Sequence, residues 1–118
     1  MTAKSLVLIM DDPDIPDVVK KKYGISIWDH WIVWNIPPDT IDIAENTIPA
    51  GAEEGLNTSK NEGYQGPCPP DREHRYFFKL YALDRKLTLP NSSTKKDVEE
   101  AMKGHILAKT ELIGLFAK

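Results

Sequence analysis

The chain has 118 residues, 41% of them hydrophobic and 28% charged, and its 15 Lys and Arg against 18 Asp and Glu give a net charge of −3. These values are those of one globular domain, residues 1–118, and exclude a disordered or fibrous chain. A net negative chain gains little from a phosphate backbone, so we expect no nucleic-acid partner. The apolar runs are too short for a membrane span, the single cysteine excludes an internal disulfide, and no apolar signal segment opens the chain. We therefore expect a cytoplasmic protein.

The first half of the chain predicts two strands joined by a polar connection. Residues 5–10 form a continuous apolar run, which is typical of a strand buried on both faces. Residues 17–26 predict a polar connection. In the second strand, residues 27–36, the even positions form one apolar face that only His30 interrupts, so strict alternation places His30 on the interior side.

The middle of the chain predicts little regular structure. Ile41 and Ile43 suggest a short third strand, and residues 49–74 then show no periodicity. Loops of that length in compact domains are usually functional or disordered, and the prolines within residues 66–70 favour an ordered loop.

The last third of the chain predicts two strands and one helix. Residues 75–83 predict a strand and residues 112–117 a closing strand. Between them Thr94 can cap a helix, with Asp97 three residues later, and His105 is expected on that helix's apolar face. The short basic stretches, residues 20–22 and 95–96, predict solvated surface. Several strands with one late helix indicate a mostly-β domain of packed sheets.

Polar side chains occur where the predicted apolar strands end. Asp12 follows the first strand, His30 interrupts the second, and His74 and Tyr76 open a later one. If these ends converge, two imidazoles, a phenol and loop N–H groups supply the donors that a phosphate or carboxylate ligand needs. A carboxylate beside such an anion makes sense as a partner that orients an imidazole and keeps it protonated.

Seven motifs, in order and spacing, resemble the phosphatidylethanolamine-binding protein family, in particular its bacterial and archaeal Raf-kinase-inhibitor-like branch. They are DPDIP at 12–16, WDH at 28–30, WNIP at 34–37, GPCPP at 66–70, HRY at 74–76, YALD at 81–84 and GH at 104–105. The resemblance runs from Ser5 to the end of the chain. It implies an antiparallel β-sandwich with a short C-terminal helix and no enzymatic chemistry or cofactor.

The resemblance also implies a site. The family's small anion site, which accepts phosphate groups and phospholipid headgroups, falls on residues of this chain that match its motifs: Asp12, Trp28, His30, Gly66, Pro67, His74 and Tyr76. Trp28 would be an aromatic wall, and Gly66 and Pro67 part of the rim. A protein partner, a kinase or a protease, would be regulated through that rim.

One departure from the family leads to a structural expectation. Members usually begin a few dozen residues earlier, with an SPxLxW segment and the first strands, whereas this chain starts almost directly on the strand before Asp12. We therefore expect an N-terminally shortened fold with an unpaired backbone edge beside residues 6–10. Such edges template pairing with another chain, which predicts a homodimer through the first strand.

Three groups of residues allow other interpretations. Asp12, Asp14 and the two histidines have the atom types of a metal site, but they lack paired ligand spacing, so no metal is expected. Cys68 could be a nucleophile with His74 as base, which gives a hydrolase or protease inhibitor as the alternative function, although no neighbouring cation activates that thiol. His105 is expected to be a core residue bonded to a backbone carbonyl.

Overall fold

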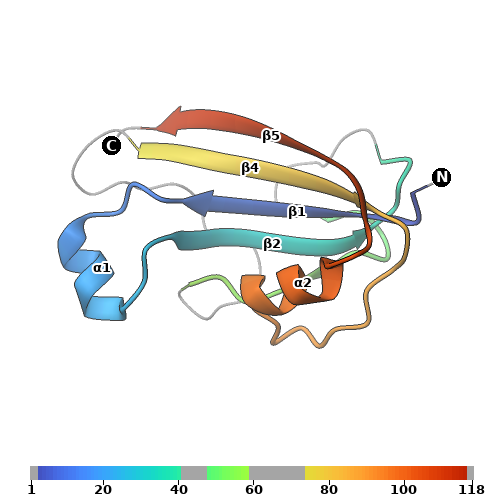
Figure 1. Ribbon diagram of the computed structural model, residues 1–118, viewed down its shortest axis with the longest axis horizontal. Coiled ribbons are helices and arrows are strands. Elements are labelled where there is room, and N and C mark those ends of the chain that lie inside the picture. The colour runs from blue at the N-terminus through green and yellow to red at the C-terminus, as the bar shows by residue number, and fades with distance from the viewer. Residues whose placement is uncertain (1–2, 41–47, 59–73, 117–118) are drawn as a thin grey trace.

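The computed structural model describes residues 3–40, 48–58 and 74–116 (Figure 1). These residues form one antiparallel sheet of five strands in the order β3-β2-β1-β4-β5, with two short helices. The elements are β1 Ser5–Asp12, α1 Asp17–Tyr23, β2 Trp28–Ile36, β3 Glu53–Glu54, β4 His74–Leu83, α2 Lys95–Met102 and β5 Ile106–Phe116. No helix in the described ranges is long and apolar enough to cross a membrane. The predicted mostly-β antiparallel fold is confirmed.

The first strand is the centre of this sheet, not its edge. β1 is hydrogen-bonded to β2 on one side and to β4 on the other, both antiparallel. Val7, Ile9 and Met10 are fully buried, in agreement with the apolar run that predicted a buried strand. The expected unpaired backbone beside residues 6–10 is therefore wrong, and a dimer through β1 loses its physical reason.

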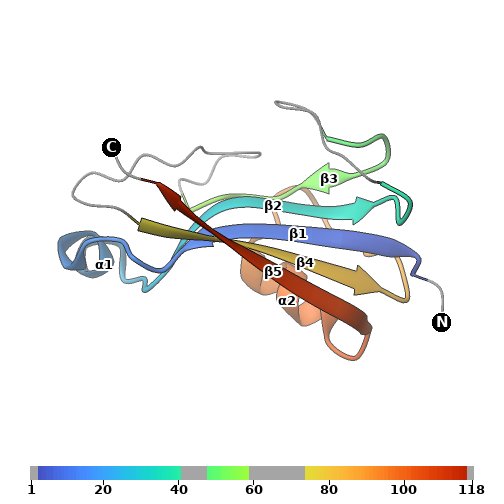
Figure 2. The same ribbon diagram turned by 90° about the horizontal axis from the view of Figure 1, so that it is seen from above.

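One face of the sheet is covered by α2 (Figure 2). Val98 and Met102, one helical turn apart, pack into a core formed with buried side chains of β1, β2 and β4 and the following loop, namely Val7, Ile9, Ile32, Trp34, Leu83 and Leu87. The helix begins where predicted, because the Thr94 backbone N–H donates to the carboxylate of Asp97 at 3.0 Å. Among the described residues a helix, not a second sheet, covers this face.

A helix replaces the predicted connection at residues 17–26. Pro16 enters α1 with an extended backbone, and Gly24 ends it in the left-handed region at φ 64°. Asp17 in the first turn and Lys20 to Lys22 in the last turn place negative and positive charge where each interacts favourably with the helix dipole. None of its residues is buried. A helix that buries no side chain has no apolar stripe, so the usual periodic signal was absent.

Two irregularities in β2 change which way its side chains point. Opposite β1 the register shifts between Leu6 and Leu8 and again between Met10 and Asp11. At the first shift Asn35 takes φ 57°, and its amide is tied to the backbone of Leu87 by two hydrogen bonds, of 2.7 and 2.8 Å. Each extra residue moves the following side chains to the other face, so the even positions of β2 do not share one face.

The chain after α2 also differs from expectation. The helix ends at Met102, and β5 already begins at Ile106, earlier than the predicted 112. His105 therefore lies outside the helix. Its Nδ1 is 2.9 Å from the carboxylate of Asp84, and about a third of its side chain is exposed. The prediction of a core histidine bonded to a backbone carbonyl is wrong.

Candidate functional site

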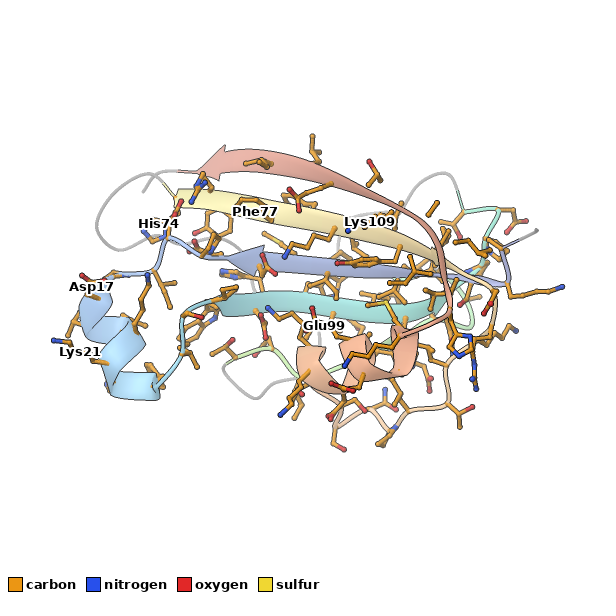
Figure 3. The ribbon with its side chains drawn as sticks, viewed as in Figure 1. Asp17, Lys21, His74, Phe77, Glu99 and Lys109 are labelled. Atoms are coloured by element: carbon orange, nitrogen blue, oxygen red, sulfur yellow. The ribbon has the colours of Figure 1, made fainter. Side chains whose placement is uncertain are left out.

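The central contact of the candidate site joins the end of β1 to the start of β4. Antiparallel pairing places these strand ends side by side, and the Asp12 Oδ2 atom lies 2.7 Å from Nδ1 of His74. The two side chains are only 3% and 1% exposed. His74 lies at the end of the sheet nearest α1 (Figure 3). Because the carboxylate accepts from Nδ1–H, it sets the tautomer and the orientation of the ring.

A tight turn after β1 holds the other oxygen of Asp12. Oδ1 accepts the backbone N–H of Asp14 at 2.7 Å, so both carboxylate oxygens are engaged. Asp14 in turn accepts three hydrogen bonds from Arg75, from the backbone N–H, Nε and Nη2, at 2.8 to 2.9 Å. The Asp14 carboxylate, through its hydrogen bond and its charge, raises the pKa of the Arg75 guanidinium. This clamp, which no sequence pattern indicated, ties the DPD turn to β4.

The His74 ring is the first of three aromatic rings that lie in a row, followed by those of Tyr76 and His30. The centroid of the Tyr76 ring is 6.2 Å from that of His74, with the ring planes inclined by 29°, and 5.1 Å from that of His30, with the planes inclined by 65°. Tyr76 and His30 are both buried. In a water-poor setting, hydrogen bonds from imidazole and phenol groups to a ligand are stronger than at the surface.

His30 is buried as predicted, but on the other face of the sheet. Strict alternation would put it beside Ile32 and Trp34, which pack against α2. Instead its ring contacts Tyr76, whose strand neighbour Phe78 is opposite Met10 on the face away from that core. The cause is the bulge: Met10 pairs with Trp31 while Asp11 pairs with Asp29, which leaves His30 as the extra residue.

Trp28 completes the part of the predicted site that the structure describes. It pairs with Asp12 across the β1–β2 ladder, and its ring meets that of Tyr23 in α1 edge-on at 5.5 Å. Tyr23 was not foreseen here, because the helix that carries it was not. Five of the seven predicted residues thus meet at one end of the sheet, and Gly66 and Pro67, together with Cys68, lie outside the described residues.

The described part of the chain holds no group of three or more His, Cys, Asp or Glu side chains arranged to bind a metal ion. Asp12 and Asp14, the two carboxylates of the DPD turn, bond to His74 and Arg75 respectively. Their geometry is that of ion pairs and turn contacts.

Comparison with known proteins identifies the family. A family model described as phosphatidylethanolamine-binding protein matches residues 1–117. The chain belongs to the phosphatidylethanolamine-binding protein family. A protein of Methanothermobacter thermautotrophicus, designated UPF0098, is 48% identical over an alignment of 121 positions that covers 98% of this chain and 75% of that protein.

Two solved structures are similar in fold as well as in sequence. A putative phosphatidylethanolamine-binding protein homolog from Chlamydia trachomatis, CT736, gives a TM-score of 0.91 at 47% identity and covers 98% of this chain and 73% of its own. YbcL of Escherichia coli, described as a new member of the mammalian family, gives 0.79 at 30% identity, with 97% and 71% covered. The resemblance drawn from the seven motifs is confirmed.

Proposed function

We propose that this member of the family is a binding protein for a small phosphate-containing anion, held at the ring row of His30, Tyr76 and His74. The observation that carries the proposal is the buried pair of Asp12 and His74, 2.7 Å apart. With Nδ1–H donated to the carboxylate, the ring donates to an anion through Nε2 only when it is an imidazolium, and the neighbouring negative charge favours that form.

The other two rings supply further donors of suitable type. The Tyr76 hydroxyl and the His30 imidazole belong to side chains that contact each other and are screened from water. Charge-assisted hydrogen bonds to an anion each contribute about 1.5–3 kcal/mol. Trp28, beside Asp12 in the sheet, would form an apolar wall for whatever the phosphate carries.

The three histidines of the chain allow a direct test by NMR titration of the imidazole Cε1–H signals with inorganic phosphate. We expect the signals of His30 and His74 to shift, while that of His105 stays unchanged. His105 is the internal control because it precedes β5 at the far end of the β4–β5 pair, where Leu83 is opposite Ile106. Equal shifts at all three histidines, or none, would contradict the proposal.

Variants identify the donors and the ligand class. His74→Ala should weaken phosphate binding by about tenfold or more, the loss of one charge-assisted bond, while His105→Ala should bind as the parent chain does. Circular dichroism must show both variants folded, and if His74→Ala is not, His74→Gln replaces it. O-phosphorylethanolamine, inorganic phosphate and ethanolamine distinguish a headgroup from a free anion, and binding of ethanolamine alone would overturn the anion model.

The absence of enzymatic activity and the regulation of a kinase or protease stay predictions from the resemblance. Hydrolysis of O-phosphorylethanolamine by the protein, followed by ³¹P NMR, would contradict the predicted absence of enzymatic activity.

A further inference from the structure

Within the described part of the chain, the last strand has an open side and carries exposed apolar residues on both of its faces. Among the described strands, β5 has β4 as its only neighbour and borders the sheet (Figure 1). Leu112 is 69% exposed, Ile113 48% and Ile106 43%. Long edges of this kind are usually shortened, charged or covered in natural sheets, which indicates that β5 pairs with a further strand.

The sequence of β5 is complementary to itself. In an antiparallel pair, directly opposed residues place their side chains on the same face of the sheet. A twofold axis between two copies must therefore lie midway between one residue and the same residue of the other copy. That residue is called the residue on the axis. With Thr110 on the axis, Lys109 of each copy is opposite Glu111 of the other, and Ala108 is opposite Leu112. An axis through Lys109 or through Glu111 would place like charges directly opposite each other, which is unfavourable.

We infer that two copies of this chain pair through β5, antiparallel, with Thr110 on the twofold axis. Both sheets would then continue into one another, with two Lys109–Glu111 ion pairs across the seam. Lys109 and Glu111 lie on one face, because they are opposite Tyr81 and Lys79 in the β4–β5 ladder, and Lys109 is labelled on this part of the molecule in Figure 3. A second copy is the occupant that this pattern favours, since it satisfies charge and apolar pairing at once.

Charge reversal tests the register. Lys109→Glu alone and Glu111→Lys alone each turn two attractive pairs into repulsive ones, so each should raise the dimer dissociation constant about tenfold or more. The double variant should recover the parent value. Mixing the two single variants should also form a heterodimer, because each then offers the charge that the other lacks. Sedimentation velocity measures all of these.

The matched controls are Lys103→Glu and Glu100→Lys, an exposed ion pair on and just after α2 that changes net charge in the same way. Neither control should alter association. As a second measurement, Thr110→Cys in a Cys68→Ser background should oxidise to a disulfide dimer, whereas exposed Thr88→Cys should not. A parent chain that is monomeric at 100 µM, or single variants that fail to associate on mixing, would overturn the inference. The β5 edge would then be expected to pair with a strand of a different polypeptide.

Discussion

Asp11 and Asp12 are consecutive residues of β1, and their buried carboxylates serve opposite faces of the sheet. Asp12 pairs with His74 at the candidate anion site, whereas Asp11 lies 3.0 Å from Nζ of Lys79 and 3.4 Å from Nζ of Lys95. Lys95 also lies 2.7 Å from Oδ1 of Asp29 in β2. The end of the central strand is thus held by the lysine ion pairs of Asp11 on one face and by the Asp12–His74 pair on the other.

Removal of Lys95 should destabilise the fold. Lys95→Met leaves Asp29 and part of the Asp11 charge uncompensated, and we expect a loss of about 1–3 kcal/mol, less than the roughly 3–5 kcal/mol of a fully buried pair because water reaches this one. Urea unfolding measures the free energy. Exposed Lys96→Met, the next residue of the same helix, is the control and should change the free energy little. Equal losses in both variants would contradict the network.

The same lysine predicts a loss of stability at alkaline pH. Burial lowers the pKa of Lys95, but the hydrogen bond to Asp29 and the charges of Asp29 and Asp11 outweigh it, so the pKa is raised. Its contribution to stability is therefore complete below the unfolded pKa of about 10.4 and disappears as the pH rises through the higher folded value. Burial also raises the pKa of Tyr81, with the same sign.

Thermal unfolding at several pH values tests this linkage. The parent chain should lose melting temperature more steeply above about pH 10 than Lys95→Met or Tyr81→Phe does, because each variant lacks one of the titrating groups. Parallel curves for all three proteins would show that neither group is linked to folding.

The Arg75 clamp should matter more for geometry than for stability. The Arg75 side chain is 53% exposed, so Arg75→Met should change the free energy of unfolding little, as expected for a solvent-screened surface ion pair. Because the clamp holds the turn that positions Asp12, phosphate affinity should fall several-fold while the fold persists. Exposed Arg85→Met is the control. Unchanged phosphate affinity in Arg75→Met would show that the clamp does not contribute to binding.

Much of this fold follows from apolar patterning, since β1, β2, β4 and α2 bury the residues that produce the pattern. α1 gave no such signal because it buries nothing. The face of His30 depends on a bulge, which is a relationship between two strands and is not visible in one. Lys95, expected on solvated surface, lies instead between Asp11 and Asp29. Long-range charge pairing of this kind has no local periodicity.

The candidate site was predictable in its residues but not in its connections. Asp12 and His74 are 62 positions apart, and only their places at strand ends, together with the family resemblance, suggested that they meet. The clamp between Asp14 and Arg75 depends on the same antiparallel pairing and on a turn whose geometry is set by Asp12 itself. Both could be located only once β1 and β4 were known to be neighbours.

Gly55 should be intolerant of any side chain. A Cβ at this position would lie 2.5 Å from the backbone oxygen of Ser93 and 2.8 Å from Cζ3 of Trp34. Gly55→Ala should therefore cost about 1–3 kcal/mol by overpacking. A Cβ at Gly104 would have no atom within 4 Å, and only the positive φ of 78° disfavours a side chain there. Gly104→Ala should therefore lower the free energy of unfolding by a smaller amount, about 1 kcal/mol. Urea unfolding that ranks the two in the opposite order would contradict this packing.

Anion affinity should fall as the pH rises through the ordinary range of histidine, from about 5.5 to 8. The imidazolium form donates from both nitrogens, whereas the neutral ring with Nδ1–H on Asp12 presents a lone pair to the ligand. Sulfate is the probe of choice, because its charge stays constant over this range and only the protein titrates. Isothermal titration calorimetry at half-unit steps gives the profile.

Asp12→Asn provides the decisive comparison for this last prediction. The amide keeps the shape of the side chain but removes the negative charge that favours the imidazolium. Its affinity profile should therefore fall at lower pH than that of the parent chain, while His105→Ala should reproduce the parent profile. If sulfate affinity is flat across the range, or if Asp12→Asn leaves the profile in place, protonated His74 is not what holds the anion.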